Sequence, residues 1–375
     1  PLAAVKAYQA KADQRPSAQP TQCRRAMVMR ERGPMRKTFI RVRGAYDNIG
    51  DEVHRGTPAF LPPLQVAGKV PSRMDLANWL VSPEHPLTAG VAVNRFWQQL
   101  FGVGLVKTAE DFGAQGEWPS HPLLLDYLAV RFRQSDWDIK ALMREIVLSA
   151  TYKQQSDAPA TAYLADPENR RLARGSRYRM DAEMIRDQLL MVSGKINTKL
   201  YGMSVKPPQP PGLWKSVTMT NERFTADTGD AIFRRSVYTF WKRIMPPPQM
   251  TILNAPSREY CVARRERTNT PLQALVLMNE PEFFKMARAC AVRTLREVGG
   301  DRAKALPRLY ERVTSHQPTS AELKTLEKAL DDFIQYYRDR PALAKKIAPQ
   351  ADAETAAWTM LAHSLLNLDA MKVRR

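Results

Sequence analysis

The chain has 375 residues, of which 44% are hydrophobic and 25% are charged, a balance typical of a globular protein with a substantial core. No stretch approaches the roughly 18 consecutive apolar residues of a membrane helix, which excludes such a span. Lys and Arg outnumber Asp and Glu by 57 to 38, and the net charge of +19 favours polyanionic partners. Those partners are nucleic acid, acidic or sulfated polysaccharide, or an acidic redox protein. The alternatives are a generally basic proteome or one face of a larger protein that compensates the charge.

The first 64 residues are predicted to form an extended N-terminal segment and linker. Residues 5–13 have the pattern of a short helix, and Thr38 to Val42 alternate as a short strand does. Residues 43–63 are rich in Gly and Pro, which favours a connection that runs over a surface. We therefore expect at most a minor β element, near the N-terminus.

Residues 65–375 are predicted to form a helical domain. Ser72 and Asp75 have the spacing of a capping box, and Asp166 and Pro167 indicate the start of a further helical stretch. The fold class is mainly α: an irregular multi-helix domain with long Pro- and Gly-rich loops. Apolar residues recur at helical spacing in residues 89–101, 121–135, 138–149, 180–193, 271–278, 281–298, 301–314, 319–337 and 352–366.

Residues 201–254 interrupt the helical domain with an irregular, Pro-rich insertion. Its prolines exclude regular structure locally, and long irregular segments in compact domains are usually functional. Trp214 follows a Pro-bounded turn, and Trp241 and Arg243 belong to a stretch that interleaves aromatic and cationic residues. Aromatic faces and Arg suit sugar rings or nucleobases. We predict these three residues as ligand-binding, with core packing as the alternative.

A second polar region, residues 94–122, mixes Asn, Arg, Gln, Asp and His with Gly and aromatic residues. Gly102 and Gly104 are expected to end a helix, and Ser120 to cap the next one. Buried polar groups without hydrogen bonds are costly, so these side chains either hold the loop or face a ligand. The predicted ligand-binding residues are Asn94, Arg95 and Gln98, and the catalytic candidates are Asp111 and His121.

A third polar region, residues 258–273, concentrates Arg beside Glu ahead of a helix that starts at Pro271. A helix N-terminus flanked by Arg is suited to sulfate, phosphate or carboxylate. The alternative is an Arg–Glu network that pins the loop to the body. The predicted ligand-binding residues are Arg258, Arg267, Asn269 and Gln273.

Two carboxylates four residues apart, Glu183 and Asp187, share one helix face. They are candidates for an acid/base pair or for metal ligands, and the alternative is pairing with nearby Arg. The catalytic and nucleotide-binding motifs G-x-S-x-G, H-E-x-x-H, the P-loop and the dinucleotide fingerprint are all absent. Whether the chain is an enzyme therefore stays open, and no metal site is predicted.

The three cysteines, Cys23, Cys261 and Cys290, have no C-x-x-C spacing. Without C-x-x-C-H this segment attaches no c-type haem, so no cofactor is expected here, although a parent protein could carry haem. A Cys261–Cys290 disulfide stays open beside the interpretation that the thiols are free and buried. Because the sequence begins at Pro1 rather than Met, we interpret it as a piece of a longer protein, in which a signal peptide cannot be judged.

Several distinctive blocks occur along the chain. They are AMVMRERG from Ala26, RGAYDNIGDEVHRGTPAFLPPL from Arg43, LANWLVSPEHPLTAGVAVNRFWQQLFGVGLV from Leu76, DAEMIRDQ from Asp181, KPPQPPGLW from Lys206, RRSVYTFWKR from Arg234, APSREYCVARRERTNTPLQALVLMNEPEF from Ala255 and AWTMLAHSLLNLDAM from Ala357. Together these blocks resemble one family, the planctomycete-specific domain of unknown function that is found downstream of planctomycete cytochrome c domains. This resemblance implies unsettled biochemistry, neighbouring cytochrome-type domains in the parent chain, and an extracytoplasmic, periplasmic location.

Three functions follow as hypotheses. The first is an extracytoplasmic domain that binds or processes acidic or sulfated polysaccharide beside cytochrome-type domains. The second is a structural or interaction domain without catalysis, and the third, least favoured because no nucleic-acid motif is present, is nucleic-acid binding. Under the first hypothesis, regions 94–111 and 258–273 converge on one cleft beneath Trp214 and Trp241.

Overall fold

The computed structural model describes residues 27–30, 35–216, 223–347 and 352–374. The chain forms two compact units, residues 1–88 and 89–375. The limits predicted from the sequence, residues 1–64 and 65–375, place the division earlier and stay a prediction. The short helix expected at residues 5–13 lies outside the described residues.

The first unit holds a small hairpin and one helix. Strands β1 (Thr38–Arg41) and β2 (Ile49–Val53) pair antiparallel, and helix α2 (Arg73–Leu80) follows. Ser72 and Asp75 form the predicted capping box at the start of α2. The backbone N–H of Ser72 is the main reason that the pKa of Asp75 lies below its ordinary value. Within the described residues, every buried hydrophobic side chain belongs to the second unit.

The second unit begins with a three-helix core. Helices α3 (Thr88–Phe101), α4 (Pro122–Gln134) and α5 (Ile139–Leu148) bury Val93, Trp97, Leu128, Phe132 and Ile146 against one another. Gly102 ends α3 in the left-handed region, at a φ of 84°, as its lack of a Cβ allows. Helix α4 is capped at His121 rather than at Ser120, with Pro122 as its first residue.

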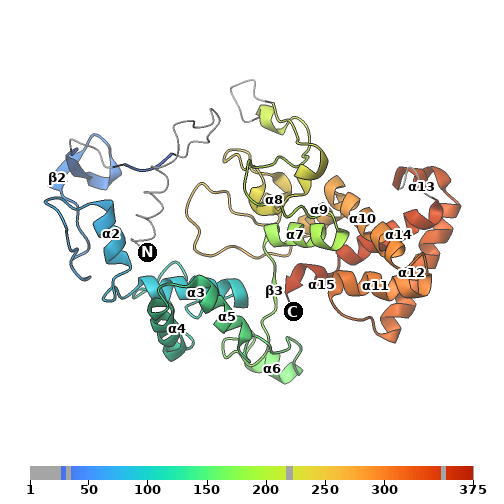
Figure 1. The fold of residues 1–375 in the computed structure, drawn as a ribbon, viewed down its shortest axis with the longest axis horizontal. Coiled ribbons are helices and arrows are strands. Elements are labelled where there is room, and N and C mark those ends of the chain that lie inside the picture. The colour runs from blue at the N-terminus through green and yellow to red at the C-terminus, as the bar shows by residue number, and fades with distance from the viewer. Residues whose placement is uncertain (1–26, 31–34, 217–222, 348–351, 375) are drawn as a thin grey trace, which may run out of the picture. The chain divides into compact units, whose positions relative to one another are not determined.

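A larger core occupies the C-terminal half of this unit. Helices α7 (Ala182–Ser193), α10 (Pro281–Glu297) and α14 (Ala353–Leu366) lie at its centre, where Trp358 and Met286 are fully buried. Figure 1 shows these helices together with their neighbours. The surrounding helices are α9 (Pro271–Asn279), α11 (Arg302–Thr314), α12 (Ser320–Arg338) and α13 (Pro341–Ile347). The mainly α prediction is confirmed.

Two short segments differ from the sequence prediction. The helix expected from Asp166 is absent, because helix α6 (Ala160–Ala165) ends there and the carboxylate of Asp166 accepts the N–H groups of Arg170 and Arg171 in a turn. Strand β3 (Tyr178–Arg179) pairs with strand β4 (Val373–Arg374), and β4 directly follows helix α15 (Asp369–Lys372). Strands of two residues are too short to show an alternating pattern.

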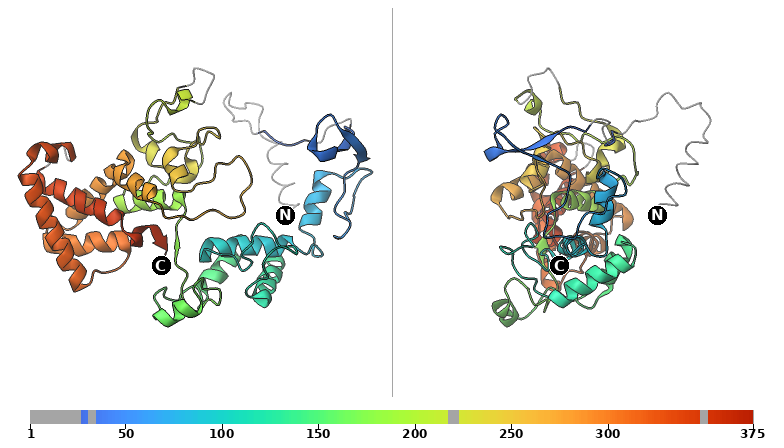
Figure 2. Two further views of the ribbon diagram at one scale, coloured as in Figure 1. Left: turned by 180° about the vertical axis from the view of Figure 1, so that it is seen from behind. Right: turned by 90° about the vertical axis from the view of Figure 1, so that its left-hand side faces the viewer.

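The described part of the Pro-rich insertion has internal anchors. It contains the short 3-10 helices η2 (Leu213–Ser216), η3 (Gly229–Phe233) and η4 (Ser236–Tyr238). Helix α8 (Pro248–Ile252) lies at its C-terminal end. The guanidinium of Arg234 donates to the carbonyls of Lys199, Tyr201 and Met203. The following loop, residues 253–270, runs outward from α8 before it returns to α9 (Figures 1 and 2).

Candidate functional site

The two polar regions predicted to converge do contact each other. Arg267 donates a hydrogen bond to the carbonyl of Gly102 at the end of α3, and Arg264 pairs with Glu110 at 3.0 Å. Gln98 Nε2 donates to the carbonyl of Ala263 at 3.5 Å. The loop of residues 253–270 is therefore attached to α3 and to the loop that follows it.

Several predicted ligand-binding side chains are used to hold this loop. Arg267 lies over the ring of Tyr178, with 4.6 Å between guanidinium carbon and ring centroid, and its Nε is 3.8 Å from Asp181. Asn269 Oδ1 accepts a hydrogen bond from Arg179 at 3.0 Å. Gln273 completes a capping box with Thr270 and donates to the carbonyl of Ile252 at 2.9 Å. These partners all belong to the chain itself.

The polar residues of region 94–122 also make internal contacts. The buried amide of Asn94 exchanges two hydrogen bonds with the backbone of Val106, at 2.9 and 3.0 Å. Asp111 Oδ1 accepts the N–H of Gly113 at 2.6 Å, and His121 Nδ1 lies 3.1 Å from the hydroxyl of Ser120. Arg95 is exposed. These contacts shape the loop between α3 and α4.

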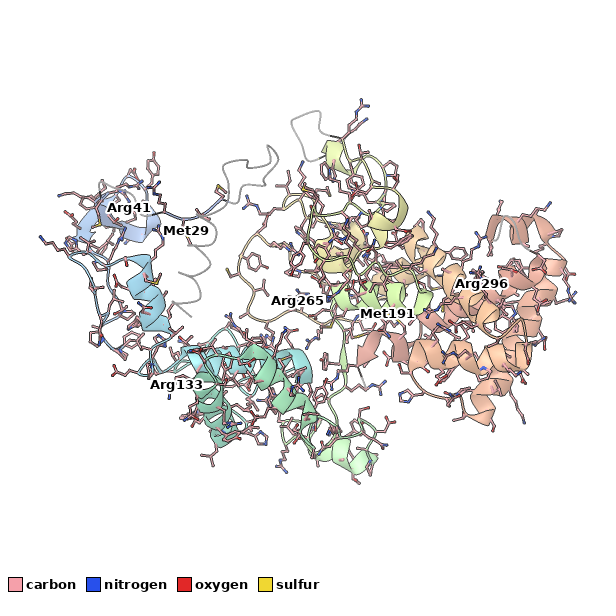
Figure 3. All side chains as sticks on the ribbon, viewed as in Figure 1. Met29, Arg41, Arg133, Met191, Arg265 and Arg296 are labelled. Carbon is pink, nitrogen blue, oxygen red and sulfur yellow. The ribbon has the colours of Figure 1, made fainter. Side chains whose placement is uncertain are left out.

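A cleft of about 840 Å³ runs along α7, and we call it the α7 cleft. Three methionines line it: Met184 and Met191 on α7, and Met180 just before that helix. Figure 3 shows Met191 on α7 and Arg265 on the loop beside that helix. The polar side chains that line the cleft are Gln99, Asp181, Glu183, Asp187, Gln188, Thr198, Arg235, Arg258 and Arg265.

The carboxylates of the α7 cleft are paired with two of its arginines. Glu183 accepts from Arg265 at 2.6 Å, and Asp181 lies 3.6 Å from the same guanidinium. Burial acts to lower the pKa of Arg265, but its hydrogen bond to Glu183 and the charge of both carboxylates outweigh this and raise that pKa. Asp187 lies 3.4 Å from Arg235 and accepts the N–H of Ser236 at 2.7 Å. The two catalytic candidates on α7, Glu183 and Asp187, are thus each paired with an arginine.

Arg258 is the arginine of the cleft whose charge is not paired with a carboxylate of the described residues. Among these residues it has no hydrogen-bonding or ion-pair partner, and its guanidinium carbon lies 4.5 Å from the ring centroid of Trp241. Trp241 in turn donates to the carbonyl of Ser257 at 3.2 Å, which fixes the ring against this corner of the loop. The backbone of Arg258 is left-handed, with a φ of 66°, at a cost of about 1–2 kcal/mol. Strained backbone of this kind is concentrated at binding sites.

The remaining predicted residues lie elsewhere. Trp214 is buried in an aromatic cluster, 5.4 Å from the ring of Phe224 and 6.1 Å from that of Phe240, and it lines a different pocket. Arg243 is exposed and does not line the α7 cleft. The structure thus brings Glu183, Asp187 and Arg258 to one cleft, and neither Trp214 nor Trp241 covers it.

Comparison with known proteins places the chain in a family. A family model described as "Protein of unknown function (DUF1553)", short name PSD1, matches residues 72–330. The chain belongs to this family. No curated protein and no solved structure matches it. All residues that line the α7 cleft fall within the matched range.

The described residues contain neither a metal cluster nor a membrane helix. No group of three His, Cys, Asp or Glu side chains in this part of the chain could hold a metal ion. No helix there is long and apolar enough to cross a bilayer. Cys261 and Cys290 do not pair; Cys261 is exposed, contrary to the expectation of burial. Burial raises the pKa of Cys290 to about 11. Cys23 lies outside the described residues.

Sequence reasoning did not select Arg235 and Arg265 as site residues. Both are adjacent to other cationic residues in the sequence, so charge alone does not distinguish them from their neighbours. Met184 and Met191, seven positions apart on the exposed side of one helix, were a signal that could have been used, because exposed apolar side chains that share a helix face indicate a binding surface.

Proposed function

We propose that this PSD1-family domain binds acidic polysaccharide in the α7 cleft. The observation that carries the proposal is Arg258, a cation that no carboxylate of the described residues pairs with, held in a strained backbone conformation against Trp241 at the edge of the cleft. A guanidinium can take a carboxylate in a bidentate manner, which an exposed lysine could not do. The cleft volume of about 840 Å³ falls in the range of small-ligand sites.

The other groups of the cleft suit the hydroxyl-rich face of a sugar chain. Glu183 and Asp187 can accept hydrogen bonds from sugar hydroxyls while they keep their Arg partners, because a carboxylate has about four lone-pair sites. The thioethers of Met184 and Met191 offer a polarizable, adaptable surface for the apolar face of a ring.

The charge balance of the cleft favours a uronate chain over a densely sulfated one. Three carboxylates stand against three arginines among the described lining residues, so only the charge of Arg258 is available to the ligand. The net charge of +19 adds long-range attraction that does not select among polyanions.

Binding of polygalacturonate, with dextran as the neutral comparison, tests the proposal. Arg258→Ala should weaken binding to polygalacturonate about tenfold or more, because a charge-assisted hydrogen bond is lost. Arg296→Ala is the matched control, since Arg296 is exposed on α10 and does not line the cleft. Calorimetry at low and high salt gives the affinities. Equal losses in both variants, or equal binding to dextran, would overturn the proposal.

A second candidate is a structural or interaction domain, favoured by the internal contacts of Arg267, Asn269 and Gln273. Under this alternative the Arg258 variant binds polygalacturonate as the parent protein does. A DNA oligonucleotide included in the same titration series tests the nucleic-acid alternative, which predicts tight binding that neither variant distinguishes.

We also propose, on the resemblance to the planctomycete-specific domain, that the parent protein is extracytoplasmic and carries cytochrome-type domains. Cell fractionation with an antibody against this domain, together with haem staining of the recognised band, tests both points. A cytoplasmic band without haem would contradict them. No catalytic step is proposed, because Glu183 and Asp187 are both engaged with Arg.

A further inference from the structure

A second pocket lies within the Pro-rich insertion, and we call it the proline-walled pocket. Its volume is about 640 Å³, and Pro208, Pro211 and Trp214 form apolar walls. Gln209, Lys215 and Arg223 provide its polar groups. None of its lining residues lines the α7 cleft, so the two sites are separate in their side chains.

The polar groups of the proline-walled pocket are donors. Lys215 and Arg223 are exposed cations, and among the described residues that line the pocket none is acidic. Nε2 of Gln209 is buried and has no hydrogen-bond partner within the described part of the chain, although it lies in the wall. A buried donor without an acceptor is costly, and an acceptor on a ligand would remove that cost.

Two further cations, neither of which lines the pocket, lie over the ring of Trp214. Lys242 Nζ is 4.2 Å from the ring centroid of Trp214, and Lys206 Nζ is 5.7 Å from it and 5.0 Å from that of Phe240. These cation–π contacts place positive charge against the indole ring that walls the pocket. The carboxylate of Asp227 accepts the backbone N–H of Lys206 at 2.8 Å, which holds this part of the segment in place.

The frame of the pocket is fixed by backbone bonds. Val205 donates to the carbonyl of Tyr238 at 2.8 Å, and Phe240 donates to the carbonyl of Val205 at 2.6 Å. These bonds tie Val205 to residues 238–240, and Trp214 packs against Phe240. The Trp214 wall is thus anchored to this frame, which reduces the entropy that ordering it for a ligand would cost.

We propose that the proline-walled pocket binds a sulfate or phosphate ester carried on a sugar-sized ligand. Donors from three positions, Gln209, Lys215 and Arg223, suit the several oxygens of a tetrahedral anion, whereas the Pro and Trp walls suit a ring. This site goes beyond the polysaccharide binding proposed for the α7 cleft and does not depend on it.

Calorimetric titration with galactose 6-sulfate, glucose 6-phosphate and galactose tests the site. The parent protein should bind one or both esters and not galactose. Gln209→Glu, which replaces the buried donor by a carboxylate, should abolish ester binding, and Lys215→Ala should weaken it about tenfold. A preference for the sulfate points to a sulfated glycan, and a preference for the phosphate points to a phosphorylated sugar.

Control variants distinguish a folding defect, a loss of binding in the proline-walled pocket and a loss of binding in the α7 cleft. Lys199→Ala removes an exposed charge just before the insertion, outside the pocket, and should bind the esters normally. Lys215 is exposed, so its variant should fold even where Gln209→Glu does not, as circular dichroism would reveal. Arg258→Ala should keep ester binding while it loses polygalacturonate. Equal binding of galactose, or ester binding that is unchanged in Lys215→Ala, would overturn the proposal.

Discussion

Arg186 and Glu282 form a buried ion pair that joins α7 to α10 across 96 positions of sequence. Their closest atoms are 2.5 Å apart, and the side chains are 0% and 3% exposed. Arg186 also donates to the carbonyls of Ile232, at 2.7 Å, and Arg234, at 3.0 Å. One guanidinium therefore holds the irregular insertion against α7 and fixes the segment that carries Arg235 into the α7 cleft.

Removal of one partner should destabilise the domain strongly. Glu282→Ala leaves the buried guanidinium of Arg186 without its counter-charge, and breaking such pairs costs about 3–5 kcal/mol. Urea unfolding followed by circular dichroism measures the loss. Asp369→Ala is the control, because its ion pair with Arg177 is 52% and 43% exposed, and such pairs contribute about 1 kcal/mol or less. Similar losses in the two variants would contradict the role assigned to the buried pair.

Arg267 should contribute to stability rather than to ligand binding. Arg267→Ala removes the donor to the carbonyl of Gly102 and the charge facing Asp181, at a cost of about 1–3 kcal/mol for the stranded groups. Thermal melting and polygalacturonate titration of one preparation give both quantities.

Arg264 provides the comparison for Arg267, because its pair with Glu110 is half exposed on both sides. Arg264→Ala should melt close to the parent protein. If Arg267→Ala instead keeps the melting temperature of the parent protein and loses polygalacturonate binding, Arg267 belongs to the ligand-binding site.

His363 should make the domain less stable in mild acid. Burial lowers the pKa of His363 below its ordinary value of 6.5, and the hydrogen-bonding carbonyl of Leu277 opposes this only in part. Because the folded state disfavours the proton, the stability contribution is present above pH 6.5 and is lost as the pH falls through the lower folded pKa.

The parent protein should therefore lose more stability between about pH 7 and pH 5 than His363→Gln does, as urea midpoints at the two pH values will show. Glu280, whose pKa burial raises, titrates in the opposite sense, but it is present in both proteins and cancels in the comparison. An identical pH dependence in the two proteins would assign the acid sensitivity to other groups.

Most of the fold could be predicted from local patterns in the sequence. The spacing of Ala182, Ile185, Leu189 and Val192 predicted the buried face of α7, and all four residues are buried. Gly194, predicted to end that helix, has the left-handed φ of 73° that a helix end requires. Such features depend on residues within a few turns of one helix, which is the range over which a single sequence is informative.

The site depended on pairings that no local pattern contains. Glu183 meets Arg265 after 82 positions, and Arg186 meets Glu282 after 96. Each of these residues has charged neighbours in the sequence that would have been equally plausible partners. Sequence alone could therefore indicate that Arg and carboxylates are concentrated in certain regions. It could not indicate which of these charges are paired and which, like that of Arg258, are not paired within the described residues.

Gly104 should be sensitive to the smallest substitution because of its approach to Asn94. A Cβ at residue 104 would lie 2.5 Å from the carbonyl oxygen of Val106 and 2.6 Å from the amide nitrogen of Asn94. The same amide makes both hydrogen bonds to Val106, so the added methyl cannot be accommodated without breaking them. Gly104→Ala should therefore cost about 2 kcal/mol or more, through strain and stranded buried groups.

Gly90→Ala is the matched control: a Cβ there meets no atom within 4 Å, and Ala in place of a helical Gly should stabilise α3 by about 0.5–1 kcal/mol. Urea unfolding of the two variants should give shifts of opposite sign. A stabilising effect of Gly104→Ala would show that the loop after α3 can rearrange, and that Asn94 does not fix it.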